Sequence, residues 1–132
     1  MRHVLLILVG ILVGALCTLA AMNAAQRANA FPRGVMAVLG HHSGEIRRQV
    51  ANGQCEADGA QRHFVAVRRL ADDLQPAFVP TGIDDALFLR YSDALREVAD
   101  RALANPAADC AALGEQLGEL GGACQACHRD FN

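Results

Sequence analysis

The last helical segment of the chain carries the pattern that most restricts the fold. Apolar residues and cysteines recur there at alternating spacings of three and four: Cys110, Leu113, Leu117, Leu120, Cys124, Cys127 and Phe131. Such spacing places side chains on one face of an α-helix, which turns once in about 3.6 residues. The segment therefore predicts a long helix with one inward face, and that face needs other helices to pack against.

Three further amphipathic segments precede this helix, at about residues 31–52, 58–75 and 84–104. In the third of these, the expected inward face is formed by Leu87, Tyr91, Leu95 (or Ala94), Val98 and Ala102. Turn signals separate the segments: "NG" at 52–53, "QPAFVPTG" at 75–82 and "NP" at 105–106. We expect Asn105 to cap the last helix and Pro106 to be its first residue. No segment has the pattern of a strand, so residues 31–132 predict an all-α, antiparallel up-down-up-down four-helix bundle.

An uncharged apolar stretch runs from Val4 to Ala21, behind Arg2 and His3. It is close to the minimum length of a membrane span and longer than the apolar part of most signal peptides. In contrast, "ANA" at 28–30 resembles a cleavage site. Residues 1–30 are therefore expected to be a signal peptide or a membrane anchor, with the anchor slightly favoured, and both alternatives export the remaining chain.

The exported part is acidic. It holds ten arginines and fourteen acidic residues, a formal charge of −4 with histidines neutral. This charge argues against a nucleic-acid partner. No catalytic acid–base pair or nucleophile stands out in the sequence, so the chain is not expected to be an enzyme.

The motif "CQACH" at 124–128 carries the chemistry. Cys124 and Cys127 are three residues apart, so both sulfurs lie on the same side of a helix. Two thiols can add across the two vinyl groups of a haem, while the adjacent His128 supplies the proximal axial ligand of the iron. The motif therefore predicts one covalent haem c. The glycine pair 121–122 fits a close approach of this cofactor to the backbone, or simple fraying of the helix end.

Three other interpretations of the motif compete with haem. A thioredoxin-like redox pair is expected at the start of a helix beside a strand. A zinc site requires a fourth ligand, and Cys110 is the nearest cysteine or histidine in sequence. A disulfide between residues three apart in a helix would be strained.

The chain resembles a known family on these residues, the class II c-type cytochromes, which include cytochrome c′ and its low-spin relatives. The resemblance rests on "LGELGGACQACHRDF" at 117–131 and more loosely on "RGVMAVLGHHSGEI" at 33–46 and "PAF" at 76–78. It implies a bundle around one haem, with Cys124 and Cys127 attached to it and His128 on the iron. Many members have a basic residue where this chain has Asn132.

The resemblance also implies where such a protein works and what it does. The expected location is the periplasm, either secreted or tethered to the inner membrane by residues about 4–22. The expected function is one-electron transfer with redox proteins of the periplasm or inner membrane. A five-coordinate haem module that binds nitric oxide or carbon monoxide is the alternative, and a homodimer is a further expectation.

The sixth iron ligand decides between these functions, because an open iron binds gases and a closed one transfers electrons. In the family, the first helix of the bundle supplies the distal residue, and Met36 is the candidate ligand, pocket residue or core residue. An ungapped match puts Ala37 there instead. His42 falls on the apolar face between Leu39 and Ile46, so it is expected to point inward, either as a hydrogen-bonded core residue or as a second candidate ligand.

The remaining aromatic and histidine residues of interest have less specific expectations. His41 is angled away from the apolar face, and His63 is expected at the surface. Phe78 is expected to pack against the haem edge or in the core.

Two further cysteines lie at connections between helices. Cys55 follows the first helix of the bundle and Cys110 begins the last. In an up-down-up-down bundle these two connections lie at the same end, so an exported protein could join them by a disulfide. The alternative is that Cys110 is a small buried apolar residue.

Overall fold

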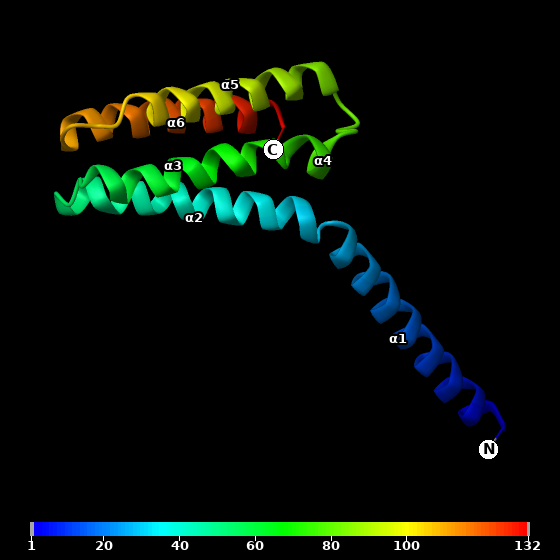
Figure 1. Ribbon diagram of the computed structural model, residues 1–132. Coiled ribbons are helices and arrows are strands. Elements are labelled where there is room, and N and C mark those ends of the chain that lie inside the picture. The colour runs from blue at the N-terminus through cyan, green and yellow to red at the C-terminus, as the bar shows by residue number, and fades with distance from the viewer. Residues whose placement is uncertain (1, 132) are drawn as a thin grey trace. The chain divides into compact units, whose positions relative to one another are not determined.

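The computed structural model describes residues 2–131, without the side chains of Leu5 and Ala28. It consists of these helices: α1 (Arg2–Ala28), α2 (Ala30–Asn52), α3 (Ala57–Asp72), α4 (Leu74–Phe78), α5 (Asp85–Ala104) and α6 (Cys110–Asp130). Residues 2–131 contain no strand. The long helices α2, α3, α5 and α6 run antiparallel in one bundle (Figure 1). The predicted all-α, up-down-up-down four-helix bundle with a preceding apolar helix is confirmed.

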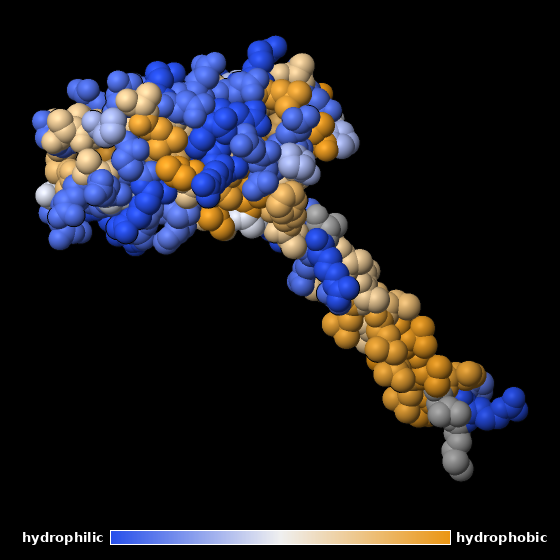
Figure 2. All heavy atoms as spheres, viewed as in Figure 1, coloured by the Kyte–Doolittle hydropathy of each residue, from blue (hydrophilic) through white to orange (hydrophobic). Residues whose placement is uncertain are grey.

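Two compact units make up the chain, one ending at Arg33 and the other beginning at Gly34. Helix α1 belongs to the first unit, and those of its apolar side chains that the structure describes are exposed along its length (Figure 2). By length and composition alone, residues Arg2–Arg27 could cross a membrane. This property is consistent with both the signal peptide and the anchor.

The core of the bundle is built from the expected helical faces. Leu113 and Leu120 of α6 are almost fully buried, while Cys124 and Cys127 on the same face are half-buried. Helix α2 contributes three buried side chains to this core: Val35, Leu39 and Ile46. Full burial of each large aliphatic side chain stabilises a fold by about 1.5–3 kcal/mol.

The inward face of α5 differs from the expected one in its first two turns. Phe88 and Ser92 are buried there, while Leu87 and Tyr91 are only half-buried. Ser92 tolerates burial because its hydroxyl donates a hydrogen bond to the carbonyl oxygen of Phe88 at 3.0 Å. From Leu95 onward the expected face is the buried one.

The predicted start of the last helix at Asn105 and Pro106 is wrong. Asn105 instead ends α5, where its backbone N–H and its side-chain amide both donate to the carbonyl oxygen of Arg101 at 3.1 Å. Helix α6 begins at Cys110, and the Asp109 carboxylate accepts a hydrogen bond from the backbone N–H of Ala112 at 2.8 Å. An aspartate that satisfies a free N–H in this way is a strong N-cap.

The second amphipathic segment ends differently from expected, because α3 ends at Asp72 and Asp73 separates it from the short helix α4. Pro76 falls in the first turn of the short helix α4, where its missing N–H is not needed. The helical turns therefore continue to Phe78 and end just before Val79 and Pro80.

A disulfide joins Cys55 to Cys110, whose Cα atoms are 5.1 Å apart. It links the connection between α2 and α3 to the first residue of α6. The two cysteines are 55 residues apart in sequence, so the bond closes a long loop in the unfolded chain.

Removal of this disulfide should destabilise the bundle. We expect the double variant Cys55→Ala/Cys110→Ala to unfold with a free energy about 2–4 kcal/mol lower than the parent, because the unfolded chain regains entropy. Urea denaturation followed by far-UV circular dichroism measures this change. Cys17→Ala is the matched control, because Cys17 is free and exposed. A double variant as stable as this control would contradict the prediction.

The position of the α6 N-cap is also testable. Asp109→Ala should lower the free energy of unfolding by about 1 kcal/mol, whereas Asp109→Asn should cost little, because asparagine caps as well as aspartate. The same denaturation experiment compares the two variants. Equal stabilities would show that Asp109 does not cap the helix.

Candidate functional site

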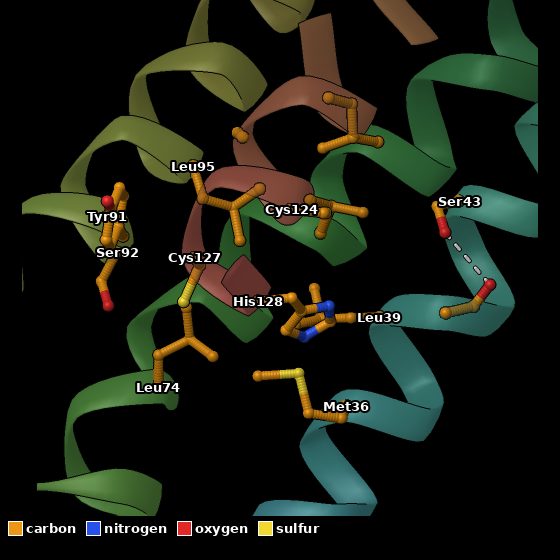
Figure 3. Close-up of a pocket in the computed structure, with 14 residues that line it drawn as sticks. Met36, Leu39, Ser43, Leu74, Tyr91, Ser92, Leu95, Cys124, Cys127 and His128 are labelled. Carbon is orange, nitrogen blue, oxygen red and sulfur yellow. Dashed lines mark hydrogen bonds between the residues drawn. The ribbon is translucent and has the colours of Figure 1, made fainter. Parts of the chain in front are cut away.

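The last turns of α6 place the cysteine–histidine motif at the wall of a cavity. The cavity has a volume of about 190 Å³, and Cys124, Cys127 and His128 all line it. Helices α2 to α5 supply most of the remaining lining, which is largely apolar: Met36, Leu39, Val67, Leu74, Tyr91 and Leu95. The structure therefore brings the predicted motif to an apolar space inside the bundle (Figure 3).

Both motif thiols are free and half-buried. Burial raises the pKa of the Cys124 thiol. The pKa of the Cys127 thiol is raised by burial and by the neighbouring Cys124 and Asp130. Burial therefore favours the protonated thiol over the thiolate at both positions.

The competing interpretations of the motif find little support in the described residues. Within residues 2–131, no group of three or more Cys, His, Asp or Glu side chains is placed to hold a metal ion. Cys110, the nearest candidate for a fourth zinc ligand, is bonded to Cys55. No strand stands beside the motif in the described chain, and the motif ends a helix, unlike a thioredoxin-like pair.

Met36 of α2 and His128 of α6 extend into the same space from different helices (Figure 3). Met36 is half-buried and His128 is exposed. Ala37 is exposed and does not line the cavity, so the alternative that placed Ala37 at the pocket does not hold. Of the two positions considered on α2, Met36 is the one beside the motif.

A second cavity of about 290 Å³ shares Met36, Cys127 and His128 with the first. Its remaining lining includes Phe78, Phe88 and Phe131. These three aromatic rings pack in a row, with Phe88 in the middle. The ring centroids of Phe78 and Phe88 are 5.6 Å apart, and those of Phe88 and Phe131 are 5.3 Å apart. The apolar space around the motif thus extends towards Phe78, which had been expected at the haem edge or in the core.

His42 does not line either cavity, so of its two expected roles the structure favours the hydrogen-bonded one over iron ligation. Its Nδ1 atom instead lies 2.9 Å from Nδ1 of His63 on α3. Burial lowers the pKa of both rings, and the positive charge of neighbouring histidines lowers it further. His63, which was expected at the surface, is half-buried by this contact, while His41 is exposed.

Tyr91 is a site residue that the sequence analysis placed only in the core. Its hydroxyl donates a hydrogen bond to the Asp130 carboxylate in the last turn of α6, and Nη2 of Arg129 lies 3.4 Å from the same hydroxyl. Tyr91 therefore links α5 to the turn that carries His128. In the sequence, the only sign of this role was the position of Tyr91 on the expected inward face of residues 84–104.

The structure leaves two expectations untested, one about the glycine pair 121–122 and one about Asn132. An added Cβ atom at Gly121 or Gly122 would meet nothing within 4 Å, so packing inside the chain does not explain this pair. Asn132, where many family members have a base, lies outside the described residues.

Comparison with known proteins gives a fold. No family model matches the chain, and no curated protein is detectably similar in sequence. The crystal structure of cytochrome c′ from Rubrivivax gelatinosus is similar, with a TM-score of 0.68 and 22% sequence identity. The match covers 80% of this chain and 94% of that one. The chain therefore has the four-helix fold of class II c-type cytochromes.

Proposed function

We propose that this chain is an exported one-electron carrier that binds one haem c through Cys124 and Cys127. One observation carries the proposal: two thiols, an imidazole and a thioether from two helices meet at one apolar cavity. The thiol pair and His128 have the donor chemistry that covalent haem requires, and the cytochrome c′-like fold is consistent with it. When bound there, the haem supplies one-electron chemistry at an iron that alternates between the ferrous and ferric states.

Different residues of the chain would have different roles in holding the haem. Cys124 and Cys127 would fix it to α6, and His128 would be the proximal ligand of the iron. Apolar side chains of four helices would exclude water from it, among them Leu39, Val67, Leu95 and Leu120. A dry, apolar setting is one of the features by which a protein sets the potential of a haem.

Met36 favours electron transfer over gas binding. Its thioether lines the same cavity as His128, and a histidine–methionine pair is the ligand set of many electron-transfer cytochromes. With Met36 on the iron, no position would be open to nitric oxide or carbon monoxide. Gas binding by a five-coordinate iron would instead require Met36 to stay off the iron.

The setting of this carrier follows from α1. As an anchor or a signal peptide, α1 would deliver the bundle to the periplasm. We propose redox proteins of the periplasm or the inner membrane as its partners, and a homodimer as a further form of assembly. The acidic balance of the exported part makes nucleic acid an unsuitable partner.

Covalent attachment is tested first. The full chain, produced in a host that matures c-type cytochromes, should retain haem stain on a denaturing gel. The variant Cys124→Ser/Cys127→Ser should lose it, because no thioether bond can form. Cys17→Ser is the control, because this cysteine lies in α1 and should not affect the stain. An unstained parent, or a stained double variant, would contradict the proposal.

The sixth ligand is tested by Met36→Leu. Leucine keeps the volume of the side chain, at a cost below about 1.5 kcal/mol, but removes the sulfur donor. We expect the parent's ferrous spectrum to be low-spin and unchanged by carbon monoxide, and the variant's spectrum to change on adding the gas. Met22→Leu, in α1, is the matched control. A parent that already responds to carbon monoxide would favour the gas-binding alternative.

A further inference from the structure

The last turn of α6, which carries His128, needs support from outside the helix. The glycine pair 121–122 lowers the helical propensity just before the motif, and α6 ends at Asp130. Helix ends fray, and most of the stability of a helix in a protein comes from packing against other elements. His128 is itself exposed, so its own burial does not fix its direction. The contacts of the neighbouring residues must therefore hold this turn.

Tyr91 of α5 contacts the turn at two consecutive residues. Its hydroxyl donates a hydrogen bond to the Asp130 carboxylate. Its ring packs edge-on against that of Phe131, with ring centroids 6.3 Å apart and ring planes at 81°. The backbone N–H of Phe131 in turn donates to the carbonyl oxygen of Cys127 at 3.0 Å and closes the turn. Tyr91 thus holds the end of α6 from the side of α5.

Asp130 and His128 lie on nearly opposite sides of α6. They are two residues apart, which separates them by about 200° around a helix that turns about 100° per residue. Figure 3 shows the ring of His128 turned towards Leu39 and Met36 of α2, while Tyr91 lies on the side of α5. A contact that fixes Asp130 against α5 therefore also fixes the side of the helix from which His128 projects.

We propose that Tyr91 is a positioning residue for His128: through Asp130, its hydroxyl holds the last turn of α6 in the rotational position that directs the imidazole into the cavity. This inference rests on the proposed function, in which His128 is the proximal ligand of a haem iron. Tyrosine suits the role because its ring lines the apolar cavity while its hydroxyl reaches a polar partner. Phenylalanine would fill the same space without making the hydrogen bond.

The test compares Tyr91→Phe and Asp130→Ala with Asp130→Asn, whose amide oxygen can still accept the tyrosine hydrogen bond. The full chain is produced in a host that matures c-type cytochromes, and haem staining verifies that each variant is loaded. Electron paramagnetic resonance of the parent's ferric haem should show one sharp set of g values, because His128 has a single orientation. This signal should broaden or split in Tyr91→Phe and Asp130→Ala, whereas Asp130→Asn should keep the parent's line width.

A second measurement follows the turn itself. Hydrogen exchange in the peptide that contains Phe131, followed by mass spectrometry, reports how often the last turn opens. Exchange should be about three- to tenfold faster in Tyr91→Phe, the net effect of one ordinary hydrogen bond. The double variant Tyr91→Phe/Asp130→Ala should exchange no faster than Asp130→Ala alone, because the two residues act as a pair.

Glu119→Gln is the matched control. Glu119 also links α6 to α5, since its Oε2 lies 3.0 Å from Nη2 of Arg101, but it precedes His128 by nine residues. Its loss should change neither the resonance signal nor the exchange of the last turn. Far-UV circular dichroism checks that each variant folds, and either Tyr91→Phe or Asp130→Ala alone suffices to decide.

The outcomes separate this inference from the proposed function. An unstained parent would overturn the proposed function and this inference with it. With a stained parent, a Tyr91→Phe signal as sharp as the parent's would overturn this inference alone, even if exchange became faster, because Tyr91 would then only stabilise the turn. The same broadening in Glu119→Gln, or in Asp130→Asn, would also overturn it.

Discussion

The structure depends on the alternation of three and four residues along α6. This spacing puts the core leucines Leu113 and Leu120 on the same helical face as Cys124 and Cys127. Burial of the leucines holds that face against the other helices, so the two thiols can only face the interior. The buried leucines of α6 thus orient the two cysteines that would hold the cofactor. A rotation of α6 that turned the cysteines outward would also expose the leucines.

Helix α2 is held in a different way. Its buried side chains are few and widely spaced, and Val35 and Leu39 are the two that flank Met36. Its far half is anchored by Ile46, which is fully buried, by the contact of His42 with His63, and by the disulfide at Cys55 just beyond its end. The helix is therefore held by core packing on either side of Met36 and by three further contacts in its far half.

This difference explains what could be predicted from the sequence. Periodicity and turn residues were enough to predict the bundle and the place of the motif on an inward face. Both follow from the spacing of apolar residues within individual helices. They could not decide whether Asn105 or Asp109 caps the last helix. Each of these residue types can end or begin a helix, and only the observed hydrogen bonds decide. For His42, the helical face and a hydrogen-bonded inward position could be predicted, but its partner could not, because His63 lies on another helix.

The two candidate iron ligands, His128 and Met36, also differ in what determines their positions. His128 follows Cys127 directly, so its place is determined by the motif itself. Met36 reaches the cavity only because Val35 and Leu39 pack as they do, and burial of two such side chains contributes about 3–6 kcal/mol. That packing would therefore decide whether the thioether reaches the iron or leaves the position open. Within a single fold, the choice between carrying electrons and binding a gas would then depend on the first turns of α2 rather than on the cysteine–histidine motif.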